Sequence, residues 1–171
     1  LCPQRVQMSL YYSLIYSHLS YGVCIWGNAD DMYLEKVRTI QNKAVRLISG
    51  ADYNDHVDPL YKELNLLNLD EIFRSQYAAL MYDQDHGTLP RCFDNYFKQV
   101  KEIHSHDTRM ADSNKLSENV KFNTITYGKK MFKFKGPKIL NEIKDLIFYR
   151  EAKTKQYFRR KYKVYLIELD K

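Results

Sequence analysis

The chain has 171 residues, of which 44% are hydrophobic, enough to bury a core in one domain or two small ones. No apolar run reaches the roughly 18 residues of a membrane-spanning helix, and no secretory signal is visible, so we expect an intracellular protein of the nucleus or cytoplasm with no membrane partner. Three widely spaced cysteines indicate free thiols rather than a disulfide framework. An opening without Met favours a fragment or degraded copy of a longer protein.

Charge is distributed unevenly along the chain. The net charge is +6, but residues 121–171 hold 15 Lys+Arg against 5 Asp+Glu, whereas residues 1–120 hold 12 against 16. This asymmetry predicts a polyanionic partner for the C-terminal portion, with nucleic acid as the first candidate. An anionic membrane surface is the second candidate, and a merely solubilising surface is the alternative.

The first half of the chain predicts amphipathic helices separated by glycine stops. Apolar residues recur at helical spacing over 6–19, and a short apolar element follows over 21–27. The clearest helix begins at a cap on Asp30 or Asp31 and ends at Gly50. Its predicted buried stripe consists of Leu34, Val37, Ile40, Gln41, Ala44, Val45 and Ile48.

The following elements are also predicted to be mainly helical. Asp58-Pro59 is typical of an N-cap and first helical residue, and indicates a short helix through residue 64. A longer helix is expected from Asn68 or Asp70 to residue 85, and a short one over 90–97. Residues 98–127 lack a period and predict an irregular connecting loop.

The C-terminal portion combines basic and aromatic residues. Alternation of Phe and Lys over 129–135 predicts a short strand, which Gly136-Pro137 would end while starting a helix through 143. The last helix is expected from about 154 to 169. The predicted fold is mainly α: a helical thumb-like bundle over 1–97, the connecting loop over 98–127, and a small basic α-rich subdomain over 128–171 with at most a short β-hairpin.

Two sets of polar residues in the sequence are candidates for metal or catalytic sites. Asp30-Asp31 resembles the paired carboxylates that hold magnesium in polymerases, but the pair leads into a helix, so helix capping explains it better. His104, His106 and Asp107 could contribute to a metal site, but further ligands are lacking, and hydrogen bonding within a loop is the favoured interpretation. We therefore assign no catalytic and no metal-binding residues.

Several sequence blocks occur in the order found downstream of the polymerase active site in reverse transcriptases of non-LTR, LINE-type retrotransposons of the jockey-like and chicken-repeat-like kind. The first blocks are the apolar helix ending in Tyr21-Gly22, then Trp26-Gly27, then Gln41 with Lys43-Ala44-Val45-Arg46. Similar blocks follow at 59–69, at Leu89-Pro90 with Phe93 and Phe97, at His104–Arg109, at 136–141 and at 157–166. One departure is Leu140, where the family usually has Trp.

The resemblance implies a thumb or post-thumb region and a C-terminal domain of a target-primed RNA-directed DNA polymerase. The parent enzyme would copy RNA from a nicked DNA end, and these regions would grip the template–primer duplex. The polymerase carboxylates and their Mg²⁺ would lie in an upstream polymerase domain, which is a possible partner, so whether the chain has any enzyme activity stays open. No cofactor is expected in this chain.

The residues expected to contact RNA or DNA lie on four segments. On the last helix, Lys155, Arg159 and Lys163 recur every four residues and can follow successive phosphates. Phe132 or Phe134, if exposed, could stack on an unpaired base. The candidate nucleic-acid-binding residues are Lys36, Lys43, Arg46, Arg109, Lys129, Lys130, Lys133, Lys155, Arg159, Arg160 and Lys163. The alternative function is a transposon-derived helical protein-interaction module that does not bind nucleic acid.

Overall fold

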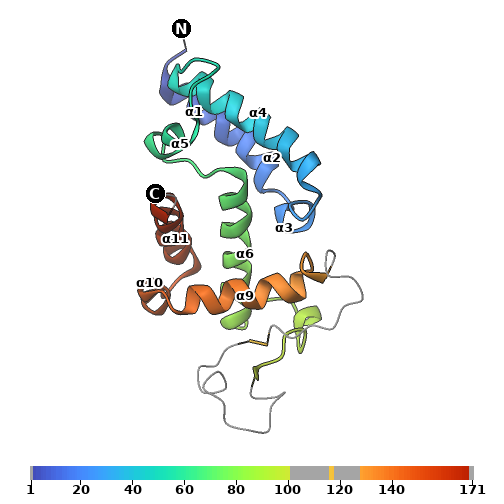
Figure 1. The fold of residues 1–171 in the computed structure, drawn as a ribbon. Coiled ribbons are helices and arrows are strands. Elements are labelled where there is room, and N and C mark those ends of the chain that lie inside the picture. The colour runs from blue at the N-terminus through green and yellow to red at the C-terminus, as the bar shows by residue number, and fades with distance from the viewer. Residues whose placement is uncertain (1, 101–115, 118–127, 170–171) are drawn as a thin grey trace. The chain divides into compact units, whose positions relative to one another are not determined.

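The structure is a computed structural model, and it describes residues 2–100, 116–117 and 128–169. The described residues form helices and no strand, which confirms the predicted mainly α fold (Figure 1). The elements are α1 (Gln4–Leu10), η1 (Tyr11–Tyr16), α2 (Ser17–Ser20), α3 (Val23–Trp26), α4 (Asp31–Ser49), α5 (Asp58–Glu63), α6 (Leu69–Asp85), η2 (Arg91–Phe93), α9 (Phe132–Lys144), α10 (Ile147–Glu151) and α11 (Lys155–Leu169).

The chain divides into two compact units. Unit 1 comprises residues 1–76 and 162–171, and unit 2 comprises residues 77–161. No helix in the described part of the chain is long and apolar enough to cross a membrane. The predicted boundaries at 97 and 128 stay a prediction.

The first helix of unit 1 is continuous from Gln4 to Ser20 and is wider in its middle. Residues Tyr11–Tyr16 form a π-helical segment, after which the Ser17 amide donates to the Tyr12 carbonyl, five residues back. A π-helical segment holds one residue more than the α-helical segment that would span the same length. Tyr11 lies at its start and is only 2% exposed, so the widened turn carries a core side chain.

Helix α4 begins and ends as its sequence predicts. The Asp30 carboxylate accepts a hydrogen bond from the Met32 amide at 3.1 Å, and Gly50 takes the left-handed conformation (φ 70°) at the C-terminal end. Most of the predicted buried stripe is confirmed, but Ile40 is 62% exposed. The prediction for Ile40 was wrong because the buried arc of α4 is narrow, and Ile40 projects beyond its edge.

The core of unit 1 contains a buried polar side chain at its centre. Gln41 is 1% exposed, and its Nε2 donates to the Tyr11 hydroxyl and to the Leu67 carbonyl, both at 2.9 Å. Tyr11 belongs to a buried hydrophobic cluster that includes Val45 and Leu66. Burial raises the pKa of Tyr11 to about 12, which keeps the phenol neutral.

The helices after α4 start close to the predicted positions. Helix α5 begins at Asp58 itself, one residue earlier than predicted, with Val57 at the N-cap. Asn68 and Glu71 form a reciprocal cap at the start of α6: the Glu71 amide donates to Asn68 Oδ1 at 2.9 Å, and the Asn68 amide to Glu71 Oε2 at 2.8 Å. In place of the predicted helix over 90–97, only the 3₁₀ turn η2 forms.

Unit 2 is held together by aromatic side chains and by ion pairs of its carboxylates. Tyr82 stacks on Phe158 with ring centroids 5.0 Å apart, and its hydroxyl donates to the Ala152 carbonyl at 2.9 Å. Asp85 accepts from the Tyr149 hydroxyl at 2.7 Å and pairs with Lys144 at 2.6 Å. These contacts link the second half of α6 to α9, α10 and α11 within the unit.

The predicted strand over 129–135 is wrong, because residues from Phe132 onward form the first turns of α9. Phe132 packs among Tyr77, Phe93, Tyr96 and Phe97, with centroid separations of 5.2 to 6.0 Å. Phe132 and Phe134 lie two residues apart, a spacing that occurs in a strand and also in a helix that buries one of the two rings. The alternation of Phe and Lys therefore did not distinguish a strand from a helix.

Candidate nucleic-acid interface

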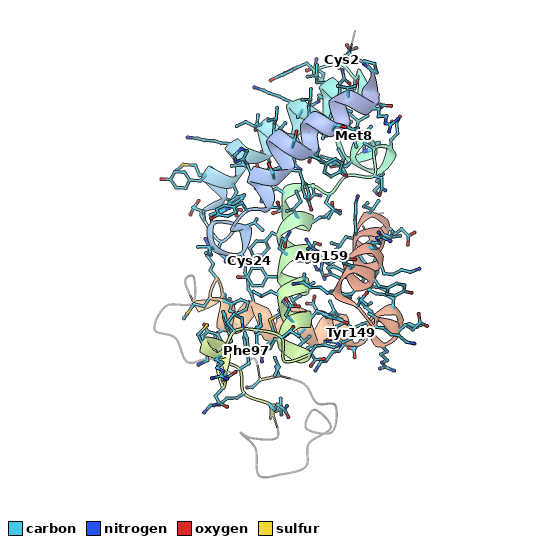
Figure 2. All side chains as sticks on the ribbon, turned by 180° about the vertical axis from the view of Figure 1, so that it is seen from behind. Cys2, Met8, Cys24, Phe97, Tyr149 and Arg159 are labelled. Atoms are coloured by element: carbon cyan, nitrogen blue, oxygen red, sulfur yellow. The ribbon has the colours of Figure 1, made fainter. Side chains whose placement is uncertain are left out.

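The predicted basic stripe on α11 contains three side chains with different surroundings. Lys155 pairs with the Asp83 carboxylate of α6, and it is thereby part of the packing of unit 2. Arg159, labelled on α11 in Figure 2, is exposed. Lys163 is half-buried, and this burial lowers the pKa of its ammonium group. Of the three, Arg159 is therefore the one most available to a phosphate.

A different surface of α11 carries exposed cations together with an aromatic ring. Tyr157, Arg160 and Lys161 are exposed and lie three or four residues apart from Tyr157 on α11, so they share one side of the helix, and the exposed Lys153 lies just before its first turn. The Lys161 ammonium lies over the Tyr157 ring, 5.8 Å from its centroid. Arg159, also exposed, lies on another side of the helix. Together we call these exposed residues, Lys153, Tyr157, Arg159, Arg160 and Lys161, the α11 basic surface.

Sequence reasoning missed Lys153 and Tyr157 as members of this surface. Part of the signal was available for Tyr157, because position 157 lies off the helical face that holds the buried Phe158 and Tyr162. The expectation for Lys155 lacked the information that Asp83 lies beside it in space. That carboxylate is 72 residues away in the sequence.

The basic residues near the start of α9 are partly covered by other groups. Lys129 is exposed, whereas Lys130 and Lys133 are half-buried. The Lys133 ammonium lies 5.4 Å from the centroid of the Tyr96 ring. The neighbouring Phe132 ring is held within the aromatic cluster described above, so it does not offer a free face to a base.

Helix α4 holds its cations in two environments. Lys36 and Lys43 are exposed. Arg46 donates twice to the Asp55 carbonyl, at 2.9 and 3.1 Å, and lies over the Tyr53 ring. Arg46 therefore fixes the chain segment after α4, and a phosphate would have to compete with a carbonyl for its guanidinium.

The remaining cation of α4 is bound within unit 1. Arg38 forms two hydrogen bonds to the Asp70 carboxylate, at 2.8 and 3.0 Å, and also contacts Asp31 and Glu35. These hydrogen bonds raise the pKa of Arg38. Arg109 and the segment 104–109 lie outside the described residues.

The two acidic or polar sites considered from the sequence have structural explanations where the structure describes them. Asp30 is the cap of α4, as expected, and Asp31 lies 3.7 Å from Arg38. Among the described residues, no group of three His, Cys, Asp or Glu side chains is placed to hold a metal ion. Cys2, Cys24 and Cys92 form no disulfide bond, and burial raises the pKa of Cys24 to about 11.

One cavity of about 380 Å³ lies within unit 1, between α5, the start of α6 and the end of α11. Its lining residues include Asp58 and Glu71 as well as Lys62. Two acidic residues and one basic residue around a cavity do not favour a phosphate. The α11 basic surface is therefore the stronger candidate for binding a polyanion.

Comparison with known proteins gives one informative similarity. The chain is 33% identical over 79 residues to a probable RNA-directed DNA polymerase from transposon X-element of Drosophila melanogaster. The matched stretch is 46% of this chain and 8% of that protein, so the chain spans a small part of its relative's length. No protein-family model matches the chain, and no solved structure matches it. The similarity supports a relation to retrotransposon reverse transcriptases.

Proposed function

We propose that this chain is a non-catalytic, nucleic-acid-binding segment of a retrotransposon RNA-directed DNA polymerase. The similarity to the X-element protein supports a relation to retrotransposon reverse transcriptases. The order of the sequence blocks favours the region that follows the polymerase active site in enzymes of jockey-like elements. The observation that carries the binding role is the α11 basic surface, where four cations and an exposed aromatic side chain lie within nine residues.

The mechanism is recognition of the phosphate backbone with one aromatic contact. Each phosphate neutralised by Arg159, Arg160, Lys153 or Lys161 releases counterions, so affinity falls steeply as salt rises. Tyr157 can stack on a base that is not paired, and arginine contacts fix the backbone beside it. The chain is assigned no reacting group, because Asp30 is a helix cap and Asp31 contacts Arg38.

The partner is RNA, DNA or their hybrid within a template–primer complex, together with the polymerase domain of the same element. This activity belongs inside the cell, in the nucleus or cytoplasm, and the free cysteines are consistent with a reducing compartment.

The test is fluorescence anisotropy with labelled single-stranded RNA, duplex DNA and an RNA–DNA hybrid over a salt series. Replacing Arg160 and Lys161 with Ala should weaken binding to every probe and reduce the slope of log K against log salt by about 2. The matched control replaces Arg91 and Lys138 with Ala, which removes the same charge from exposed positions outside the candidate residues. Absence of binding to all three probes at low salt would overturn the proposal.

A second candidate function is a protein-interaction module, and the exposed apolar residues of α4 favour it. Binding of such a partner would depend weakly on salt, whereas phosphate binding depends on it steeply. The same salt series therefore separates the two functions.

A further inference from the structure

Helix α4 exposes large apolar side chains at a regular spacing. Tyr33, Ile40 and Leu47 are 58%, 62% and 72% exposed, and they lie seven residues apart. Residues that recur every seven positions follow one narrow stripe along a helix. From Tyr33 to Leu47 this stripe is about 21 Å long, at about 1.5 Å of rise per residue.

Two lysines continue the same pattern. Lys36 and Lys43 are exposed, and each lies three residues after an apolar residue of the stripe and four residues before the next. The order Tyr33, Lys36, Ile40, Lys43, Leu47 is the alternating three-and-four spacing of a coiled-coil seam. We call these five residues the α4 seam.

The composition of the seam selects its partner by charge. A second helix packed along the seam would bury part of the three apolar side chains, which stabilises the pair. The ammonium groups of Lys36 and Lys43 would then face that helix, and they would need carboxylates there to offset their desolvation. The complementary surface is a helix whose own seam alternates apolar residues, which would pack on Tyr33, Ile40 and Leu47, with Glu or Asp residues, which would pair with Lys36 and Lys43.

Helix α4 of a second copy of this chain does not supply those carboxylates. Helix α4 has two acidic residues, Asp31 and Glu35, and both contact Arg38 on another part of its circumference. Self-association through the seam would therefore leave the lysines without a partner of opposite charge.

A nucleic-acid duplex is a poorer match as well. Its backbone would pair with the two lysines but would leave the three apolar side chains against charged phosphates. By contrast, the α11 basic surface exposes cations around a single aromatic ring. The two surfaces differ in composition, and this difference favours two kinds of partner.

We propose that the α4 seam docks an acidic amphipathic helix of a partner protein. The seam fits a helix of about four turns with apolar side chains every seven residues and carboxylates between them. This inference does not depend on nucleic-acid binding by α11, because it concerns residues of unit 1 alone.

The probe is a fluorescently labelled helical peptide of three heptads with Leu at one seam position and Glu at the other. Its control is the same peptide with Lys in place of Glu. We expect saturable binding of the Glu peptide to the full chain, and at least tenfold weaker binding of the Lys peptide. Ile40→Glu should weaken binding of the Glu peptide at least tenfold, while circular dichroism of the variant should match the unmodified chain because position 40 is exposed.

Charge reversal gives the sharper test. The variant Lys36→Glu/Lys43→Glu should prefer the Lys peptide over the Glu peptide, whereas the control Lys138→Glu, an exposed charge change on α9, should retain the original preference. No binding of the Glu peptide, or equal binding of both peptides, would overturn the proposal.

Two further outcomes would assign the seam to another occupant. A concentration-dependent dimer in sedimentation that Ile40→Glu abolishes would show that the seam binds a second copy. A loss of duplex binding in Lys36→Ala/Lys43→Ala, without peptide binding to the unmodified chain, would assign it to nucleic acid. Either result overturns docking of an acidic helix, and neither bears on Arg160→Ala/Lys161→Ala, which tests the α11 basic surface separately.

Discussion

Replacing Gln41 should destabilise unit 1 more than any exposed substitution on the same helix. Its amide nitrogen joins α4 to the first helix through the Tyr11 hydroxyl, and to the segment before α6 through the Leu67 carbonyl. Gln41→Met keeps the length of the side chain and removes both hydrogen bonds. Gln41→Ala also removes the atoms that fill the space.

The expected magnitude follows from what each variant leaves behind. Two lost hydrogen bonds cost about 1 kcal/mol each, and the buried Leu67 carbonyl is left without this donor. The Gln41 Oε1 atom has no hydrogen-bond partner among the described residues, so removing it returns part of that cost. We expect a loss of about 2 kcal/mol for Gln41→Met. For Gln41→Ala we expect about 3 to 4 kcal/mol, because a cavity forms.

The measurement is urea unfolding followed by tryptophan fluorescence. Trp26 is the single tryptophan of the chain and lies in unit 1, so its signal reports that unit. The control is Lys43→Met, an exposed change on α4 that should alter the free energy of unfolding by less than about 0.5 kcal/mol. If Gln41→Met were as stable as Lys43→Met, the buried amide would contribute nothing and the reasoning would fail.

Three further perturbations test other parts of the structure. Burial raises the pKa of Tyr11 from 10.0 to about 12, so the folded state keeps this phenol neutral where the unfolded state ionises it. The free energy of unfolding in urea should therefore fall by up to about 3 kcal/mol as pH rises from 10 to 12, and Tyr11→Phe should flatten that decline. Gly136→Ala would place a Cβ atom 2.8 Å from the Met81 sulfur. We expect this variant to unfold several degrees lower in calorimetry, and an unchanged Tm would refute the close packing at Gly136. Asp30→Ala should cost about 1 kcal/mol in urea unfolding and Asp30→Asn little, because an amide oxygen can still accept from Met32; equal losses would contradict the capping role.

The parts of the fold that could be predicted are those with local causes. The cap at Asp30 and the stop at Gly50 depend on residues within one helical turn, so the bounds of α4 followed from the sequence. Phe158 and Tyr162 lie four residues apart on α11 and are both buried, as the period of a helix accounts for. Periodicity was sufficient wherever one helix face packs against a core.

Other features depended on partners that are distant in the sequence. Ile40 fits the helical period, yet nothing packs over it in the described structure, and the period alone cannot show which apolar residue lacks a neighbour. Phe132 was assigned to a strand because its helical character depends on an aromatic cluster assembled from α6, residues 93–97 and α9. Lys155 was expected to contact phosphate, and its pairing with Asp83 could not be read from local sequence.

The widened turn over Tyr11–Tyr16 has a consequence for how the length of this helix can vary among related sequences. A π-helical segment is one residue longer than the α-helical segment that would connect the same two flanks. Deleting one residue within it should therefore convert the helix to regular α geometry while Gln4–Leu10 and Ser17–Ser20 keep the sides they now present. A deletion within α4 would instead rotate one half of that helix against the other. Natural copies of this segment should accordingly show one-residue gaps in the first helix and none in α4.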